Sequence, residues 1–214
     1  MELKQTLWYW HELIDVARQY RTIYVTGPQR SGTRYTTFSL AKDLDKRDAG
    51  TRERTHTLYS GKFKGTLHRD KIVSGVRNRY KVVIHCPHET HRLHTLSSNC
   101  LVIWMDRNVE DVINSEDKIN WHEKCFVNEE IPKYVDMFPE YEDTIKKFNR
   151  NWYMKMWVWN NIQKDLMTVD YLELPYETLI QTDGYVSKKD RLGFKKDQIS
   201  PINNNPLISK IGLK

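Results

Sequence analysis

Residues 23–37 read IYVTGPQRSGTRYTT, a β-branched run followed by a glycine turn and a hydroxyl-rich stretch. β-Branched and aromatic residues predict a buried strand over 21–27 that ends at Gly27, and the next segment, 32–44, favours a helix. A strand, a glycine turn and a helix start present backbone N–H groups and the positive end of the helix to an anion. We therefore expect an anion-binding loop, although a plain turn with a capping hydroxyl is the alternative. The groups expected to bind the anion are the Arg30 side chain and the hydroxyls of Ser31, Thr33, Thr36 and Thr37.

The loop is close to the nucleoside-triphosphate loop GxxxxGK[ST], but it differs at two decisive positions. Thr33 stands at the lysine position and Arg34 at the Ser/Thr position. In the triphosphate loop that lysine contacts the terminal phosphates and the hydroxyl binds magnesium. Asp106 is the nearest acidic candidate for a magnesium partner after a strand. The loop is therefore predicted to bind an anion other than magnesium-bound ATP.

The remaining segments continue the alternation of short apolar strands and helices. Strands are predicted at 54–59, 81–86, 100–106 and 168–176, and helices at 3–19, after Pro87, at 108–119 and within 137–165. This order predicts a three-layer α/β/α fold with a mainly parallel central sheet. We expect one domain over 1–214, with a basic insert at about 45–80 and an irregular tail from about 183.

Composition limits the class of protein. The 214 residues are 39% hydrophobic and 29% charged, which is ordinary for a globular domain. No apolar run approaches the ~18 residues of a membrane span, and the N-terminus lacks the apolar core of a signal peptide. Three cysteines without a CxxC pair predict reduced, partly buried thiols. We expect a cytoplasmic protein without a membrane partner, whose net charge of +6 favours anionic ligands.

Ligands of parallel α/β sheets bind beyond the carboxyl ends of the strands. Three predicted strand ends carry polar chemistry: GPQRSGTR at 27–34, HCPH at 85–88 and DRN at 106–108. Their agreement predicts one composite site at that edge of the sheet.

These motifs resemble the sulfotransferases that use 3′-phosphoadenosine 5′-phosphosulfate (PAPS), a branch of the P-loop fold. The first family motif, a strand followed by [KR]SGT, is RSGT at 30–33; the second, RNxxDVxxS, is RNVEDVINS at 107–115. A strand followed by YExL matches YETL at 176–179. The segment HCP at 85–87 resembles the one that carries the catalytic histidine of the cytosolic members, and His85 precedes Arg107 by 22 residues.

The resemblance implies a role for each matched residue. Arg30 and the loop N–H groups would hold the phosphosulfate and stabilise the leaving phosphate oxygen. Arg107 and Ser115 would bind the 3′-phosphate. His85 would remove a proton from the acceptor hydroxyl or amine as it attacks sulfur. The implied catalytic residues are His85 and Arg30, and the implied PAPS-binding residues are Arg30, Ser31, Gly32, Thr33, Arg34, Tyr35, Arg107, Ser115 and Tyr176, with the two tyrosines near the adenine and no metal.

The sequence departs from the family at several positions. Arg34 replaces a usual Ser or Thr, and Val83 stands where the cytosolic members often have a lysine. Residues 210–212 are the nearest counterpart of the family's C-terminal Arg-Lys-Gly segment. A base other than His85, for example His56 or a carboxylate, is the open alternative for proton removal.

Other patterns have plainer explanations. His85, His88, His91 and His94 recur every three residues, a spacing that drifts around a helix and brings at most two of them to one metal ion. The stretch NWYMKMWVW at 151–159 is predicted to be core, with a nucleic-acid stacking platform as the alternative. The basic run at 45–71 is a solvated surface or a site that recruits an anionic acceptor.

A PAPS-dependent sulfotransferase acting on a small-molecule or glycan acceptor is thus the predicted function. A P-loop nucleotide or small-molecule kinase is the first alternative. A non-catalytic basic module that binds nucleotides or nucleic acid is the second, although nucleic acid is not the expected partner.

Overall fold

The computed structural model describes residues 4–47, 55–59, 81–96, 99–120 and 126–179. Most of the predicted basic insert at 45–80, and the whole tail from about 183 with its segment 210–212, lie outside these residues. The side chain of His56, the alternative base, is also outside the described part. Cys86 and Cys100 are free thiols as predicted and are buried more completely than expected, whereas Cys125 lies outside the described residues.

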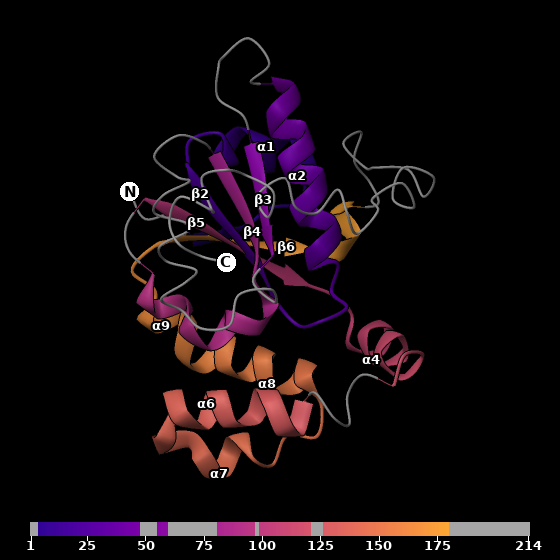
Figure 1. Ribbon diagram of the computed structural model, residues 1–214, viewed down its shortest axis with the longest axis vertical. Coiled ribbons are helices and arrows are strands. Elements are labelled where there is room, and N and C mark those ends of the chain that lie inside the picture. The colour runs from indigo at the N-terminus through magenta and orange to yellow at the C-terminus, as the bar shows by residue number, and fades with distance from the viewer. Residues whose placement is uncertain (1–3, 48–54, 60–80, 97–98, 121–125, 180–214) are drawn as a thin grey trace, which may run out of the picture.

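A six-stranded parallel sheet forms the centre of the molecule, with the strand order β1-β6-β5-β2-β4-β3 (Figure 1). The strands are β1 (Lys4–Thr6), β2 (Thr22–Thr26), β3 (Thr55–Tyr59), β4 (Lys81–His85), β5 (Cys100–Asp106) and β6 (Asp170–Pro175). Helices cover both faces of this sheet, so the predicted three-layer α/β/α fold is confirmed. Within the described residues, no helix has the length and apolar character of a membrane span.

Helices and single turns fill the connections between these strands. They are α1 (Trp10–Ala17), α2 (Thr33–Arg47), η2 (Pro87–Thr95), α4 (Val109–Asp117), η3 (Phe126–Glu130), α6 (Ile131–Met137), η4 (Pro139–Tyr141), α7 (Glu142–Ile145), α8 (Asn151–Val158), η5 (Trp159–Gln163), α9 (Lys164–Leu166) and η6 (Tyr176–Leu179). The helix predicted over 3–19 is wrong at its start, because residues 4–6 pair with β6. Backbone pairing at the open edge of the sheet outweighs the helical spacing of these residues.

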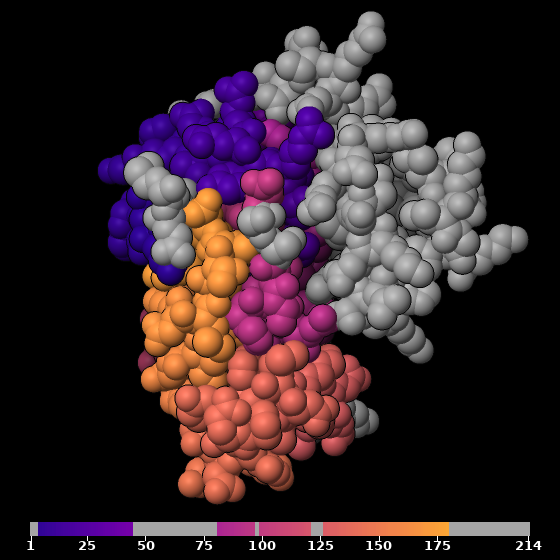
Figure 2. All heavy atoms as spheres, turned by 90° about the vertical axis from the view of Figure 1, so that its left-hand side faces the viewer, coloured from indigo at the N-terminus to yellow at the C-terminus, as the bar shows by residue number. Residues whose placement is uncertain are grey.

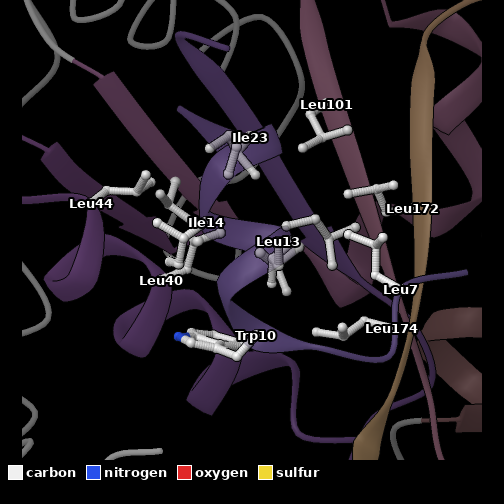
Figure 3. Close-up of a cluster of buried hydrophobic side chains, with 14 of the residues drawn as sticks. Leu7, Trp10, Leu13, Ile14, Ile23, Leu40, Leu44, Leu101, Leu172 and Leu174 are labelled. Carbon is white, nitrogen blue, oxygen red and sulfur yellow. The ribbon is translucent and has the colours of Figure 1, made fainter. Parts of the chain in front are cut away.

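Side chains of the central strands alternate between two cores, so β2 is buried along its whole length. Ile23 and Val25 point to the face covered by α1 and α2, where Leu13 of α1 also packs (Figure 3). Tyr24 points to the opposite face. There the rings of Trp104 and Trp159 stack with centroids 4.4 Å apart, which fixes η5 against β5.

A third cluster of buried side chains joins α6 and α8 through Tyr134, Phe138, Met154 and Val158. In Figure 2, the segment from η3 to α7 forms one end of the molecule, next to the part of the chain that contains η2. This helical layer therefore extends the second face of the sheet and is in a position to reach the strand ends.

The strand order creates a switch point between β2 and β5. The chain leaves β2 through α2, which packs on β3 and β4, whereas the chain that leaves β5 through α4 returns to the sheet at β6 on the other side. In open α/β sheets ligands bind in the crevice at such a reversal. The loop at 27–32 and Arg107 flank this point.

Candidate active site

The loop between β2 and α2 is a tight turn with three residues at positive φ. Gly27 has a φ of +135°, and a Cβ there would lie 2.6 Å from the carbonyl oxygen of Met105. Gly32 has a φ of +89°. Arg30 has a φ of +71°, which is costly for a residue with a side chain and is often found at functional sites.

Hydroxyl groups of this segment mainly stabilise the turn itself. The Ser31 hydroxyl donates to the carbonyl oxygen of Pro28 at 2.6 Å. The Thr36 and Thr37 hydroxyls donate to carbonyl oxygens one turn earlier, at 3.2 and 2.8 Å. In this structure these three hydroxyls donate within the turn and α2, and their role as donors to an anion stays a prediction. The backbone N–H groups at the start of α2, which have no acceptor within the helix, are the remaining donors.

Arg30, Arg107 and Ser115 meet at the switch point, on the edge of the sheet where the sequence predicted a composite site. Arg30 Nε donates to Ser115 Oγ at 2.9 Å, and Arg107 Nη1 donates to the Arg30 carbonyl oxygen at 2.9 Å. The Asn108 side chain caps α4 by accepting from two backbone N–H groups, which sets the direction of the helix that carries Ser115. Two cationic side chains and one hydroxyl are thus concentrated within a single contact group.

Tyr176 supports this group from the start of η6. Its ring lies under the Arg107 guanidinium, whose central carbon is 4.1 Å from the ring centroid. A Cβ on Gly32 would lie only 2.8 Å from Cδ2 of the same ring. Tyr176 therefore holds Arg107 and limits residue 32 to glycine. Its predicted position near an adenine stays a prediction.

The other two predicted loop residues lie away from the arginine group. Tyr35 is half-buried and packs against the core that α1 and α2 share. The Arg34 side chain is exposed, with its guanidinium carbon 6.0 Å from the centroid of Phe38. Its charge acts on His85, so this departure from the family adds positive charge on the β4 side of the loop.

His85 is the last residue of β4 and pairs in register with Val25 of β2. Its Nε2 lies 3.0 Å from the Thr33 hydroxyl oxygen, and the side chain is 4% exposed. Burial, together with the positive charges of His88, Arg34 and Lys155, lowers the pKa of His85 to about 3. The imidazole is therefore neutral at pH 7, but so low a pKa also makes it a weak proton acceptor in the free protein.

The other three histidines of the repeat point in different directions. His88 Nδ1 lies 2.9 Å from Glu130 Oε1, and His94 Nδ1 lies 3.3 Å from Gln163 Oε1. His91 packs against the Tyr134 ring at 5.5 Å between centroids. Within the described residues, no three metal-ligating side chains come together.

Lys155 is the site residue that sequence reasoning missed. As predicted, the aromatic stretch 151–159 packs largely into the core, but its lysine is fully buried. Lys155 Nζ donates to Gln29 Oε1 at 2.9 Å and to the Pro87 carbonyl oxygen, and it lies 3.4 Å from Glu130 Oε2. The only signal in the sequence is a lysine at a helical position that should be buried.

Buried charge in this region is balanced around Glu130. Burial alone would raise its pKa, but the charges of Lys155, His88 and Lys133 hold the pKa of Glu130 at about 2. Burial lowers the pKa of Lys155, and the Glu130 carboxylate opposes that shift. The pair is therefore an ion pair enclosed beneath the loop.

Trp152 is a second residue that the sequence did not indicate. Its indole Nε1 donates to the Arg107 carbonyl oxygen at 3.2 Å. Helix α8 therefore contacts both the segment after β5, through Trp152, and the loop after β2, through Lys155.

The chain matches no model of a known protein family and no curated protein. Its function must therefore be inferred from the residues that meet at the carboxyl ends of the strands.

Proposed function

We propose that the protein is a PAPS-dependent sulfotransferase that transfers a sulfuryl group to an acceptor hydroxyl, or alternatively to an amine. The observation that carries the proposal is the contact of Arg30 with both Ser115 and Arg107. These residues come from the two motifs that resemble the family, and they meet at the switch point of the sheet. A ligand with two separate anionic groups suits two arginines supported by a helix start.

The residues present fit the two anionic ends of PAPS. The N–H groups at the start of α2 and the Arg30 guanidinium would hold the 5′-phosphosulfate. The Arg107 guanidinium and the Ser115 hydroxyl would hold the 3′-phosphate. Each of these side chains already takes part in the arginine group, so binding requires an exchange of hydrogen bonds rather than a rearrangement of strands.

His85 is the proposed base. The acceptor oxygen attacks sulfur, the bond between sulfur and the phosphate oxygen breaks, and His85 takes the proton that the acceptor loses. Arg30 stabilises the negative charge that develops on the leaving phosphate oxygen. The contact of His85 with Thr33 places the imidazole beside the loop that would hold the transferred group.

The same residues give less support to the alternative function, a P-loop kinase. Thr33, which stands at the lysine position of a triphosphate loop, contacts His85 instead. The Ser/Thr position is Arg34, which cannot ligate magnesium because a guanidinium has no acceptor. We therefore retain the kinase only as an outcome of the binding experiment.

Calorimetric titration with the product nucleotide, 3′-phosphoadenosine 5′-phosphate, tests the proposal. Wild type should bind it without magnesium, and Arg107→Ala should weaken binding about 10–100-fold, the value of one or two charge-assisted hydrogen bonds. Arg18→Ala is the matched control, because Arg18 lies at the amino ends of the strands, where its backbone carbonyl accepts from Lys81 at the start of β4. Transfer of label from PAPS to a panel of phenols, amines and glycans then identifies the acceptor.

Three results would overturn the proposal. Wild type that does not bind the nucleotide, or Arg107→Ala with unchanged affinity, removes its basis. Magnesium-dependent binding of ATP in place of the product nucleotide would identify a kinase. Salt-sensitive binding of oligonucleotides without nucleotide specificity would identify a nucleic-acid-binding module.

A further inference from the structure

Lys155 joins the two segments that follow the neighbouring strands β2 and β4. Its first acceptor, Gln29, lies in the loop after β2, one residue before Arg30. Its second acceptor, the Pro87 carbonyl, lies two residues after His85 of β4. One ammonium group therefore ties the anion-binding loop to the segment that carries the proposed base.

The loop has a second attachment to the same helix. The Gln29 backbone N–H donates to Asn151 Oδ1 at 3.4 Å, and Asn151 is the first residue of α8. Gln29 is thus held by α8 through both its side chain and its backbone. It is 7% exposed, so these attachments lie beneath the loop rather than on its surface.

Stability is a weak reason for this arrangement. Burying an ammonium and a carboxylate costs several kcal/mol per ion, and buried ion pairs can often be replaced by apolar side chains without loss of stability. Lys155 and Glu130 are 0% and 1% exposed, so the cost applies to both. A buried lysine that donates to the Gln29 side chain and to the Pro87 carbonyl fixes the relative position of these two segments, which an apolar side chain cannot do.

We propose that Lys155 is a positioning residue that fixes the loop at 27–32 against the chain after β4, so that His85 keeps its contact with Thr33. The effect of this positioning on transfer rests on the proposed function. The effect on His85 does not, and it can be measured without turnover. Since misplacement by about 1 Å can cost about 100-fold in rate, a small shift of the loop would be visible in kcat.

Three variants separate positioning from stability. Gln29→Met removes the loop acceptor and leaves the Lys155–Glu130 pair intact. The double variant Lys155→Met with Glu130→Gln removes both charges together, so that no buried carboxylate is left without its lysine. Lys133→Met is the matched control, because Lys133 also lies 3.5 Å from Glu130 but is 39% exposed and touches neither strand end. Thermal unfolding confirms that each variant is folded, and Gln29→Met keeps the test open if the double variant is not.

The readouts are the imidazole ¹⁵N shifts of His85, the affinity for 3′-phosphoadenosine 5′-phosphate, and kcat. In Gln29→Met, which keeps the Lys155 charge, the His85 shifts should change and kcat should fall about 10–100-fold. The double variant should show the same fall in kcat, whereas its His85 shifts also respond to the lost charge of Lys155. Nucleotide affinity should stay within about threefold, since Arg30, Arg107 and Ser115 are retained. Lys133→Met should match wild type in all three.

The outcomes distinguish this inference from the proposed function. Unchanged His85 shifts in both test variants would overturn the positioning role, even in an active sulfotransferase. Changed shifts with unchanged kcat would overturn its importance for transfer. Changed shifts in a protein that neither binds the nucleotide nor transfers sulfate would support the positioning role and overturn the proposed function.

Discussion

Arg107 donates a hydrogen bond from Nη1 to the backbone carbonyl of Arg30, at 2.9 Å and across 77 positions of sequence. The acceptor belongs to a residue at a φ of +71°, so the end of β5 stabilises an unfavourable conformation in the loop after β2. The side chain of Arg30 turns to Ser115 of α4. The shape of the loop and the direction of its cation therefore both depend on the segment that follows β5.

Arg30→Gly and Arg30→Ala should separate the strain of this position from its charge. Both variants lose the guanidinium, so both should weaken binding of the product nucleotide by a similar factor. Only glycine adopts positive φ at little cost, so Arg30→Gly should be more stable than Arg30→Ala by about 1 kcal/mol. Urea unfolding and calorimetric titration measure the two effects. Equal stabilities would mean that Arg30 carries no strain.

Gly32→Ala should destabilise the protein by about 1–3 kcal/mol, since it adds a Cβ at positive φ and 2.8 Å from the Tyr176 ring. Displacement of that ring should also weaken nucleotide binding, because Arg107 lies over it. In a Tyr176→Ala background the steric part of the cost should vanish and the backbone part should remain. The same loss of stability in both backgrounds would show that the ring contact is not the cause.

If His85 is the base, kcat/KM and kcat should each fall at acid pH, but at two different pH values. The pKa of His85 is lowered to about 3 in the free protein by burial and by neighbouring positive charges, so kcat/KM should fall only as the pH approaches about 3. A bound anionic donor favours the imidazolium, so the limb in kcat should lie at higher pH. His85→Asn should abolish transfer and retain nucleotide binding. Two limbs that coincide near pH 6.5 would indicate another base.

Glu116→Gln should stabilise the protein at alkaline pH. The Glu116 carboxyl is fully buried, has no hydrogen-bond partner among the described residues, and its pKa is raised by burial to about 7. The unfolded chain loses this proton near pH 4.5 and the folded protein near pH 7, so the stabilisation present below pH 4.5 is lost as pH rises through 7. At pH 8 the free energy of unfolding of Glu116→Gln should exceed that of wild type by on the order of 1 kcal/mol.

Urea unfolding at pH 5 and pH 8 measures this difference. Asp117→Asn is the control, since Asp117 is exposed on the same helix and forms an ion pair with Arg150 at 2.7 Å. If the free energy of unfolding of Glu116→Gln falls between pH 5 and pH 8 as much as that of wild type, Glu116 does not titrate in this window.

Local patterns in the sequence were enough for the architecture and for part of the site. The strands were predictable because β-branched runs at 21–27, 81–86 and 100–106 must be buried on both faces. Arg30, Arg107 and Ser115 could be grouped because each follows or faces the end of a parallel strand, and such ends share one edge. Their meeting is therefore a consequence of topology.

Contacts that depend on side-chain direction were beyond the sequence. Thr36 and Thr37 looked like anion ligands, but their hydroxyls bond to the preceding helical turn, which is an equally satisfactory local arrangement. Lys155 lies in a stretch that was predicted to be core, and its contacts could not be predicted because its acceptors lie in distant segments. Residues 4–6 looked helical because the β6 edge that they pair with is encoded far away in the chain.

The bond between Lys155 and Gln29 spans 126 positions of sequence, and this separation has a consequence for biosynthesis. The loop leaves the ribosome long before α8 exists, so during most of translation it has no support beneath it. Contacts at such separation form late, after the cost of closing a long stretch of chain has been met. A nascent chain that stops before α8 should therefore contain every residue of the anion-binding loop and still lack the contacts that fix the loop against the end of β4.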